Sequence, residues 1–184
     1  MTTIFHLCLF ALLFGLASVS LATDAAHLSQ EDDIREAIFR YQFEHNASSQ
    51  QKDAHDYFLS IGEHESDPSD EFMKRFAGHR PPVRKASACR ITALGSVINK
   101  RTGKSGLLFR VGNITWLSEA AATAYGGYSE GNTSASANTY TVTKENGRWK
   151  VIKDEINAIS RRAQDPAWLI LFEKSPLKGK ACLA

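Results

Sequence analysis

The chain has 184 residues, of which 43% are hydrophobic and 23% charged, a composition typical of one globular domain and not of a disordered or fibrous chain. Its formal net charge of +2 gives no reason to expect a nucleic acid or an anionic membrane as partner. The charge is uneven, with 13 acidic against 6 basic residues at positions 23–80 and 7 against 16 at positions 81–184. This asymmetry fits either an acidic helical layer against a basic sheet layer or a basic sheet face that meets an anionic ligand.

Residues 1–22 have the features of a secretory signal peptide. They include no Asp, Glu, Lys or Arg, the segment Ile4–Val19 is apolar, and Ser20 and Ala22 place small residues at the −3 and −1 positions of a cleavage site. We therefore expect a mature chain that begins after Ala22 and is secreted or periplasmic, with no stable membrane partner. The alternative is an uncleaved anchor, because the uncharged run approaches the roughly 20 residues that span a bilayer.

Cysteine usage agrees with export, because cleavage would remove Cys8 and leave the even pair Cys89 and Cys182. In an oxidising compartment these two could form a disulfide that ties the C-terminal tail to the sheet, and two buried thiols are the alternative. Three Asn-X-Ser/Thr triplets would accept glycans only in a host with that machinery. They begin at Asn46, Asn113 and Asn132.

Two helices are predicted in the first half of the chain. The first begins near Ser29 with acidic residues in its first turn, and from Ile34 onward its apolar residues recur every three or four positions. The second has Asp67 as its N-cap and Gly78 as its terminator. Between them, Asp56–Gly62 could end a helix or form a short strand, and its aromatic and branched residues favour the strand.

From residue 83 onward the sequence predicts a series of antiparallel strands. A change in the phase of the apolar residues near Gly112 and Asn113 predicts a β-bulge. Alternating small residues between Ala120 and Gly126 predict room above the sheet for a helix or a pocket. The predicted strands are Val83–Leu94, Leu107–Leu117, Glu119–Ser129, Ser134–Lys144 and Arg148–Ile156.

The last two strands are joined by Asn146-Gly147, the pair that best supplies the two positive φ angles of a type I′ turn. This turn predicts a register across the hairpin: Glu145 with Arg148, Lys144 with Trp149, Val142 with Val151 and Tyr140 with Lys153. It also predicts one apolar face, formed by Tyr140, Val142, Trp149 and Val151, and one largely solvated face. The hairpin therefore predicts a sheet that is covered on one side.

Three segments carry a resemblance to a known superfamily: the opening helix EDDIREAIFRYQF, the strand ITWLSEAAATAYGGY and the hairpin ANTYTVTKENGRWKV. Through them the chain resembles the nuclear transport factor 2-like superfamily, the cystatin-like α+β cone that ketosteroid isomerases and polyketide cyclases share. The segments DPSDEFMKRFAGHRPP and AYGGYSEGN are similar to uncharacterised secreted bacterial members. The resemblance covers most of residues 31–155 and implies N-terminal helices packed on a curved antiparallel sheet of about four to five strands.

We therefore expect a signal peptide at residues 1–22, a single cone domain at residues 29–159 and a C-terminal tail at residues 160–184. The resemblance implies a cavity between the helices and the concave sheet face. One implied function is a non-catalytic exported domain that binds a small apolar or anionic molecule, or that docks a partner or forms a homodimer through its sheet. The alternative is a cofactor-independent isomerase, cyclase or dehydratase that uses a cavity carboxylate or His as general base.

The candidate cavity residues are ionisable or aromatic: His45, His55, Glu63, His64, Trp116, Tyr125 and Tyr128. Solvated loop positions for the ionisable residues and core positions for the aromatic ones are the alternative interpretation. The histidine spacings fit no compact ligand pattern, so neither a metal site nor a cofactor is predicted. The Thr-Gly-Lys-Ser segment at residues 102–105 lacks the earlier glycine of a phosphate loop and is predicted to be a turn. No single residue can be assigned as catalytic.

Overall fold

The computed structural model describes residues 29–46, 48, 51–131 and 134–160. Contacts divide the chain into two compact units, Met1–Asp33 and Ile34–Ala184. The first unit contributes only the helical residues 29–33 to the described part, and every other described element belongs to the second. The predicted signal peptide and the tail from residue 161 onward lie outside the described residues.

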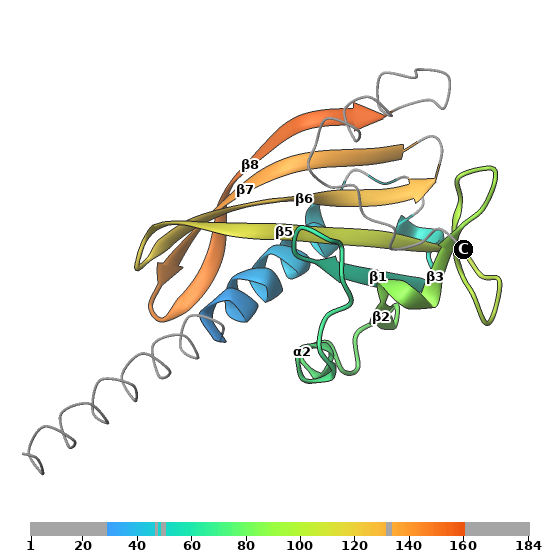
Figure 1. Cartoon of the computed structure of the whole chain (residues 1–184), viewed down its shortest axis with the longest axis horizontal. Helices are drawn as coiled ribbons and strands as arrows, with labels where there is room; N and C mark the ends of the chain where they lie inside the picture. The colour runs from blue at the N-terminus through green and yellow to red at the C-terminus, as the bar shows by residue number, and fades with distance from the viewer. Residues whose placement is uncertain (1–28, 47, 49–50, 132–133, 161–184) are drawn as a thin grey trace, which may run out of the picture. The chain divides into compact units, whose positions relative to one another are not determined.

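A long helix occupies residues 29–45 of the described part, where the sequence predicts the first helix. In the second unit its residues Ile34, Ile38 and Phe39 are completely buried, because their spacing puts them on one helix face. This face packs against the sheet (Figure 1). The helix ends at Asn46, whose Nδ2 donates to the carbonyl oxygen of Gln42 at 2.8 Å.

Six strands form the main sheet: β1 (Asp56–Ile61), β2 (Val83–Lys85), β5 (Gly106–Ser118), β6 (Ala121–Gly131), β7 (Ser134–Glu145) and β8 (Arg148–Ser160). Their order is β2-β1-β5-β6-β7-β8 (Figure 1). β1 runs parallel to both β2 and β5, whereas β5 to β8 are antiparallel to one another. The α+β class and the four long antiparallel strands are confirmed. The described sheet is mixed, however, and its six strands exceed the four or five that were expected.

The prediction of one strand over Val83–Leu94 is wrong. The chain leaves the main sheet through a 3₁₀ turn, Ala86–Ala88, and then forms β3 (Cys89–Ile91). β3 pairs with β4 (Val97–Asn99) in a separate two-stranded sheet, and β4 was not predicted. The turn buries Ala86 in a second, smaller apolar core. Apolar periodicity could not reveal the break, because it does not show where a strand changes its hydrogen-bonding partner.

The short helix α2 spans Asp70–Lys74 and begins later than predicted. Ser69 is its N-cap, since the Ser69 Oγ accepts from the backbone amide of Phe72 at 3.1 Å. Asp67, the expected cap, accepts from the backbone amide of Ser87 at 2.8 Å. Its carboxylate therefore joins the approach to α2 to the turn after β2, a contact between distant segments that no local capping rule predicts.

The β7–β8 hairpin turns at Asn146 and Gly147, whose φ angles of +51° and +77° are those of the predicted type I′ turn. The three predicted residue pairs nearest the turn are confirmed, up to Val142 with Val151. As predicted, the face that includes Val142 is buried against the long helix.

Bulges interrupt the antiparallel strands. The predicted bulge in β5 is confirmed at residues 112–113, between Val111 and Ile114. A second bulge, at Ile152 in β8, was not predicted, and it pairs Tyr140 with Asp154 where Lys153 was expected. Because partners across an antiparallel pair point to the same face, this shift puts Asp154 beside Tyr140 on the face that the helix covers.

The main core lies between the long helix, α2 and this face of the sheet. The small residues of β6 have the predicted effect: Ala122 and Ala124 are buried and let the helix approach. Gly126 continues the row, and a methyl group there would lie 3.1 Å from the Tyr140 ring and 3.2 Å from Gln42 Nε2. Gly126 therefore lies close to Gln42 of the long helix, with no room for a larger side chain.

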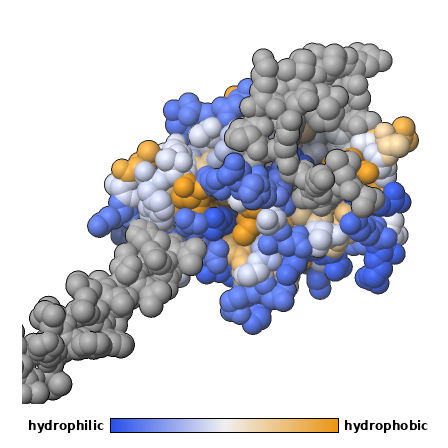
Figure 2. Space-filling view, in the orientation of Figure 1, coloured by the Kyte–Doolittle hydropathy of each residue, from blue (hydrophilic) through white to orange (hydrophobic). Residues whose placement is uncertain are grey.

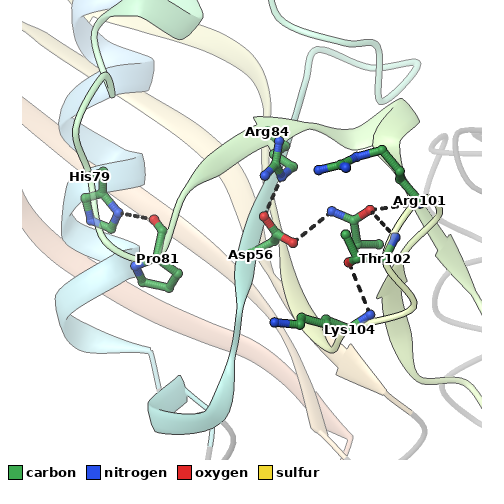
Figure 3. A network of polar contacts seen from close by, with 8 residues as sticks. Asp56, His79, Pro81, Arg84, Arg101, Thr102 and Lys104 are labelled. Carbon is green, nitrogen blue, oxygen red and sulfur yellow. Dashed lines mark hydrogen bonds and ion pairs between the residues drawn. The ribbon is translucent and has the colours of Figure 1, made fainter.

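Asp56, at the start of β1, holds a polar network at the other face of the sheet (Figure 3). The residue is 4% exposed, and its carboxylate accepts from Arg84 Nε and, at 2.8 Å, from Asn99 Nδ2. Asn99 Oδ1 accepts in turn from the backbone amides of Arg101 and Thr102. This network joins β1, β2 and β4 and shapes the Thr-Gly-Lys-Ser segment into the predicted turn.

On the face drawn in Figure 2, hydrophobic residues form small separate patches among hydrophilic ones. The exposed apolar residues include Leu117, Ile152 and Ile156. None of the described helices has the length and apolar character needed to cross a membrane. The expected homodimer through the sheet stays a prediction.

Candidate functional site

A cavity of about 60 Å³ lies between the C-terminal half of the long helix and strands β6 to β8. Its lining combines three tyrosine and two isoleucine side chains with polar ones, and we call it the helix–sheet cavity. The lining residues are Tyr41, Gln42, His45, Asn46, Tyr128, Ser136, Asn138, Tyr140, Asp154, Ile156 and Ile159.

The periodicities of helix and strand bring these side chains together. Tyr41 and His45 are four residues apart and therefore lie on the same side of the helix. In β7, Ser136, Asn138 and Tyr140 alternate with outward residues, so all three face the helix. The bulge in β8 turns Asp154 inward. The cavity thus depends on one regular helix, one regular strand and one irregular strand.

Among the described residues, Asp154 is the one carboxylate that lines the helix–sheet cavity. Asn138 Nδ2 donates to its Oδ1 at 2.5 Å. Burial raises the pKa of the Tyr41 hydroxyl, and the charge and hydrogen bonding of Asp154 raise it further. Tyr41 is therefore a neutral hydroxyl at physiological pH, and Asp154 is held between an amide and a phenol.

Gln42 and Tyr140 form the floor of the helix–sheet cavity. Gln42 Nε2 lies 3.1 Å from the carbonyl oxygen of Arg110, 3.5 Å from that of Gly127 and 3.3 Å from the hydroxyl oxygen of Tyr140. Burial strongly raises the pKa of Tyr140, and the hydrogen bond from Gln42 opposes that shift only in part. Tyr140 is therefore neutral, and since it accepts from Gln42 its own hydroxyl hydrogen is available to a ligand.

His45 lies at the rim of the cavity, with its ring stacked on Tyr41 at a centroid distance of 4.3 Å. Its Nδ1 is 3.1 Å from the backbone carbonyl oxygen of Tyr41. Because a carbonyl can only accept, Nδ1 carries the hydrogen, and in the neutral ring Nε2 is an acceptor.

Two buried acceptors stand out at the cavity. Gln42 is 3% and Asn138 5% exposed, and Gln42 Oε1 and Asn138 Oδ1 have no hydrogen-bond partner among the described residues. Both amide orientations follow from their neighbours, because the NH₂ groups face carbonyl or carboxylate oxygens and a flip would bring oxygen against oxygen. Buried acceptors normally have partners, so these two atoms are an unusual polar feature of the residues that line the cavity.

A second, smaller cavity of about 20 Å³ lies on the other face of the sheet, where Arg110 and Tyr125 line it. Arg110 Nε is 3.3 Å from the carboxylate of Glu65. The guanidinium is thus already paired with an acid, which makes this cavity a poor receptor for an anion.

The structure brings together only two of the predicted cavity residues, His45 and Tyr128, which both line the helix–sheet cavity. Tyr125 lines the second cavity, and Trp116 packs edge-on against Trp149 at 5.7 Å. The three remaining candidates are exposed and line neither cavity: His55, Glu63 and His64.

Sequence reasoning missed Tyr41, Gln42, Asn138, Tyr140 and Asp154 as site residues. A signal existed in β7, where Asn138 has the same strand parity as the apolar residues of the covered face. A polar residue at an inward position is informative, because its burial needs a partner. No such signal existed for Asp154, whose direction depends on an unpredicted bulge.

The predicted disulfide stays a prediction. Cys89 is completely buried at the start of β3, and Cys182 lies outside the described residues. The described residues contain no group of three or more His, Cys, Asp or Glu side chains that could hold a metal ion. In the helix–sheet cavity His45 and Asp154 are the lining residues with metal-binding atoms of this kind.

Comparison with protein-family models, with curated proteins and with solved structures finds no match.

Proposed function

We propose that this protein is an exported domain of the nuclear transport factor 2-like kind that binds a small molecule in its helix–sheet cavity. The observation that carries the proposal is the pair of buried acceptors on Gln42 and Asn138, both at the cavity. Leaving such groups without a partner costs about 1–3 kcal/mol each. A ligand that donates hydrogen bonds would remove that cost, so the pair supports binding over simple packing.

Export remains part of the proposal. It rests on the apolar, uncharged segment at residues 1–22 and the small residues before the expected cleavage site. N-terminal sequencing of protein from its own host should give a chain that starts at Thr23. A chain that starts at Met1 would contradict cleavage.

Ligand binding can be tested by native mass spectrometry of protein purified from its own host. We expect an excess mass that disappears on denaturation. Asn138→Leu should abolish the excess mass, because it removes a cavity acceptor and fills part of the space. Asn157→Leu is the matched control: Asn157 is exposed, lies on the same strand as Asp154 and, among the described residues, donates a hydrogen bond to Thr139 Oγ1.

A bound mass retained equally in both leucine variants would place the ligand elsewhere. Absence of excess mass, together with a small-molecule collection that shifts no Gln42 or Asn138 amide resonance, would refute the proposal. Circular dichroism of each variant shows whether it has folded.

The second candidate function is proton transfer at a carbon next to a carbonyl group. It is favoured by Asp154, an inward carboxylate, lying on the same sheet face as the neutral Tyr140 hydroxyl. A carboxylate can take up the proton while a neutral phenol donates to the developing oxyanion. In D₂O, the protein should speed exchange of the protons next to the carbonyl of cyclohexanone, and Asp154→Asn should slow this by about 100-fold or more. Equal exchange with both proteins would exclude this role.

A further inference from the structure

The residues that line the helix–sheet cavity indicate the chemical class of its ligand. This inference rests on the proposed binding function. The hydrogen-bond acceptors of the lining place the first requirement on the ligand. Gln42 Oε1, Asn138 Oδ1 and the Asp154 carboxylate all belong to lining residues, and the first two are buried without a partner among the described residues. A ligand that fits them must present several hydrogen-bond donors from one small group.

The charges of the lining residues narrow the chemical class of the ligand further. Asp154 is an acid that lines the cavity, and the described lining residues include no Lys or Arg. The amide that contacts Asp154 and the neighbouring Tyr41 are both neutral. Among the described residues, a cation would therefore find a carboxylate without a competing ion pair, whereas an anion would be repelled. This disfavours the anionic ligand that the charge asymmetry of the sequence left open.

Aromatic rings support the same class. Tyr41, Tyr128 and Tyr140 line the cavity, and Tyr41 and Tyr140 meet edge to face at a centroid distance of 6.0 Å. The negative faces of such rings attract an ammonium group. Ile156 and Ile159 form an apolar part of the lining and are 59% and 45% exposed. They could cover a hydrocarbon group that extends from the cavity.

The volume of the helix–sheet cavity limits the size of the ligand group that can enter it. A cavity of about 60 Å³ takes a head of a few heavy atoms, since about 10–15 Å³ on the same measure is enough for one water molecule. We propose that the helix–sheet cavity binds a primary ammonium group on a short alkyl or aryl chain, with the ammonium at Asp154 and Asn138 and the chain against Ile156 and Ile159.

The test uses three probes of one shape: phenethylammonium, neutral 2-phenylethanol and anionic phenylacetate. Each is titrated into the full-length protein at pH 7, with amide resonances of Gln42 and Asn138 as readout. We expect phenethylammonium to bind about 10- to 100-fold more tightly than 2-phenylethanol, because a charged hydrogen bond is stronger than a neutral one. Phenylacetate should shift neither resonance.

Two variants distinguish binding that depends on the charge of Asp154 from binding that depends on the shape of the cavity. Asp154→Asn should reduce phenethylammonium binding to about the level of 2-phenylethanol, and circular dichroism shows whether the variant has folded. The matched control Glu155→Gln removes an exposed acid from the next position of β8 and should leave both affinities unchanged.

Each other outcome overturns the proposal in its own way. Tighter binding of 2-phenylethanol or phenylacetate would refute the ammonium class and leave small-molecule binding standing. Equal losses in Asp154→Asn and Glu155→Gln would show attraction by overall charge and not by the cavity. If no probe shifts either resonance, the ammonium class is wrong, and a co-purified mass in native mass spectrometry then decides whether the helix–sheet cavity binds anything.

Discussion

Replacing Gly126 by alanine tests how closely β5 and the long helix approach β6 beside the cavity. An added methyl group would lie 2.4 Å from the backbone carbonyl oxygen of Arg110, besides its contacts of 3.1 Å with the Tyr140 ring and 3.2 Å with Gln42 Nε2. Ordinary carbon–oxygen contact needs about 1 Å more, and a backbone oxygen cannot rotate away. Overpacking of this kind lowers the free energy of unfolding by about 1–3 kcal/mol. We expect a loss in the upper half of that range, because the clash is with a backbone atom.

Alanine also restricts the unfolded chain more than glycine does, which increases the free energy of unfolding by about 0.4–1 kcal/mol. The net loss for Gly126→Ala is therefore about 2 kcal/mol. Gly112→Ala is the matched control, because its methyl group would lie no closer than 3.2 Å to any atom and that contact, to the carbonyl oxygen of Tyr125, needs only a slight adjustment. Its stability should change by about 0.5 kcal/mol or less.

Urea unfolding followed by circular dichroism measures both variants against the wild type. At about 4 °C per kcal/mol for a domain of this size, Gly126→Ala should also lower Tm by about 8 °C. Equal stability of the two alanine variants would refute the close approach at Gly126 and, with it, the described floor of the cavity.

Three further predictions concern the core, the buried tyrosine and the Asp56 network. Phe39→Ala should lower the free energy of unfolding by about 3–5 kcal/mol, because Phe39 is completely buried between Phe72 and Phe76; a urea midpoint near that of the wild type would contradict this packing. Burial raises the pKa of Tyr140 in the folded state, so the folded protein holds this proton more tightly than the unfolded chain, and stability should be constant below about pH 10 and fall above it. Tyr140→Phe should make that alkaline fall shallower in urea titrations between pH 8 and 11, and an unchanged slope would rule out this contribution. Arg84→Ala should cost about 1–3 kcal/mol by leaving the buried Asp56 carboxylate with a single amide partner, and a further Asp56→Asn change should recover part of the loss in thermal denaturation.

Part of the fold could be predicted because it depends on local chemistry. Asn146-Gly147 determines a tight turn through the φ angles it tolerates, and the pairing of Val142 with Val151 follows from that turn. The first helix could be predicted for a similar reason, since its apolar spacing from Ile34 onward matches the helical repeat. The residues that determine each of these elements lie within a few positions of one another in the sequence.

The strand ends and the partners of β1 could not be predicted in this way. The segment after Val83 alternates suitably for one strand, but β1 offers it only three parallel partners before the chain turns at Ala86. Parallel pairing of β1 with β2 and β5 joins segments that lie far apart in the sequence. Such pairing depends on contacts between distant segments, and no local pattern of residues shows it.

For the candidate site, the sequence alone determined the ingredients: a helix that carries Tyr41 and His45, and a strand with Asn138 and Tyr140 on its covered face. Only the tertiary structure decided that they surround one cavity with Asp154. The physical reason is the bulge at Ile152. One extra residue reverses the direction of the side chains that follow it, up to the next register shift of β8 at Asn157. An inward carboxylate at this place is therefore a property of the paired sheet and not of the strand's own sequence.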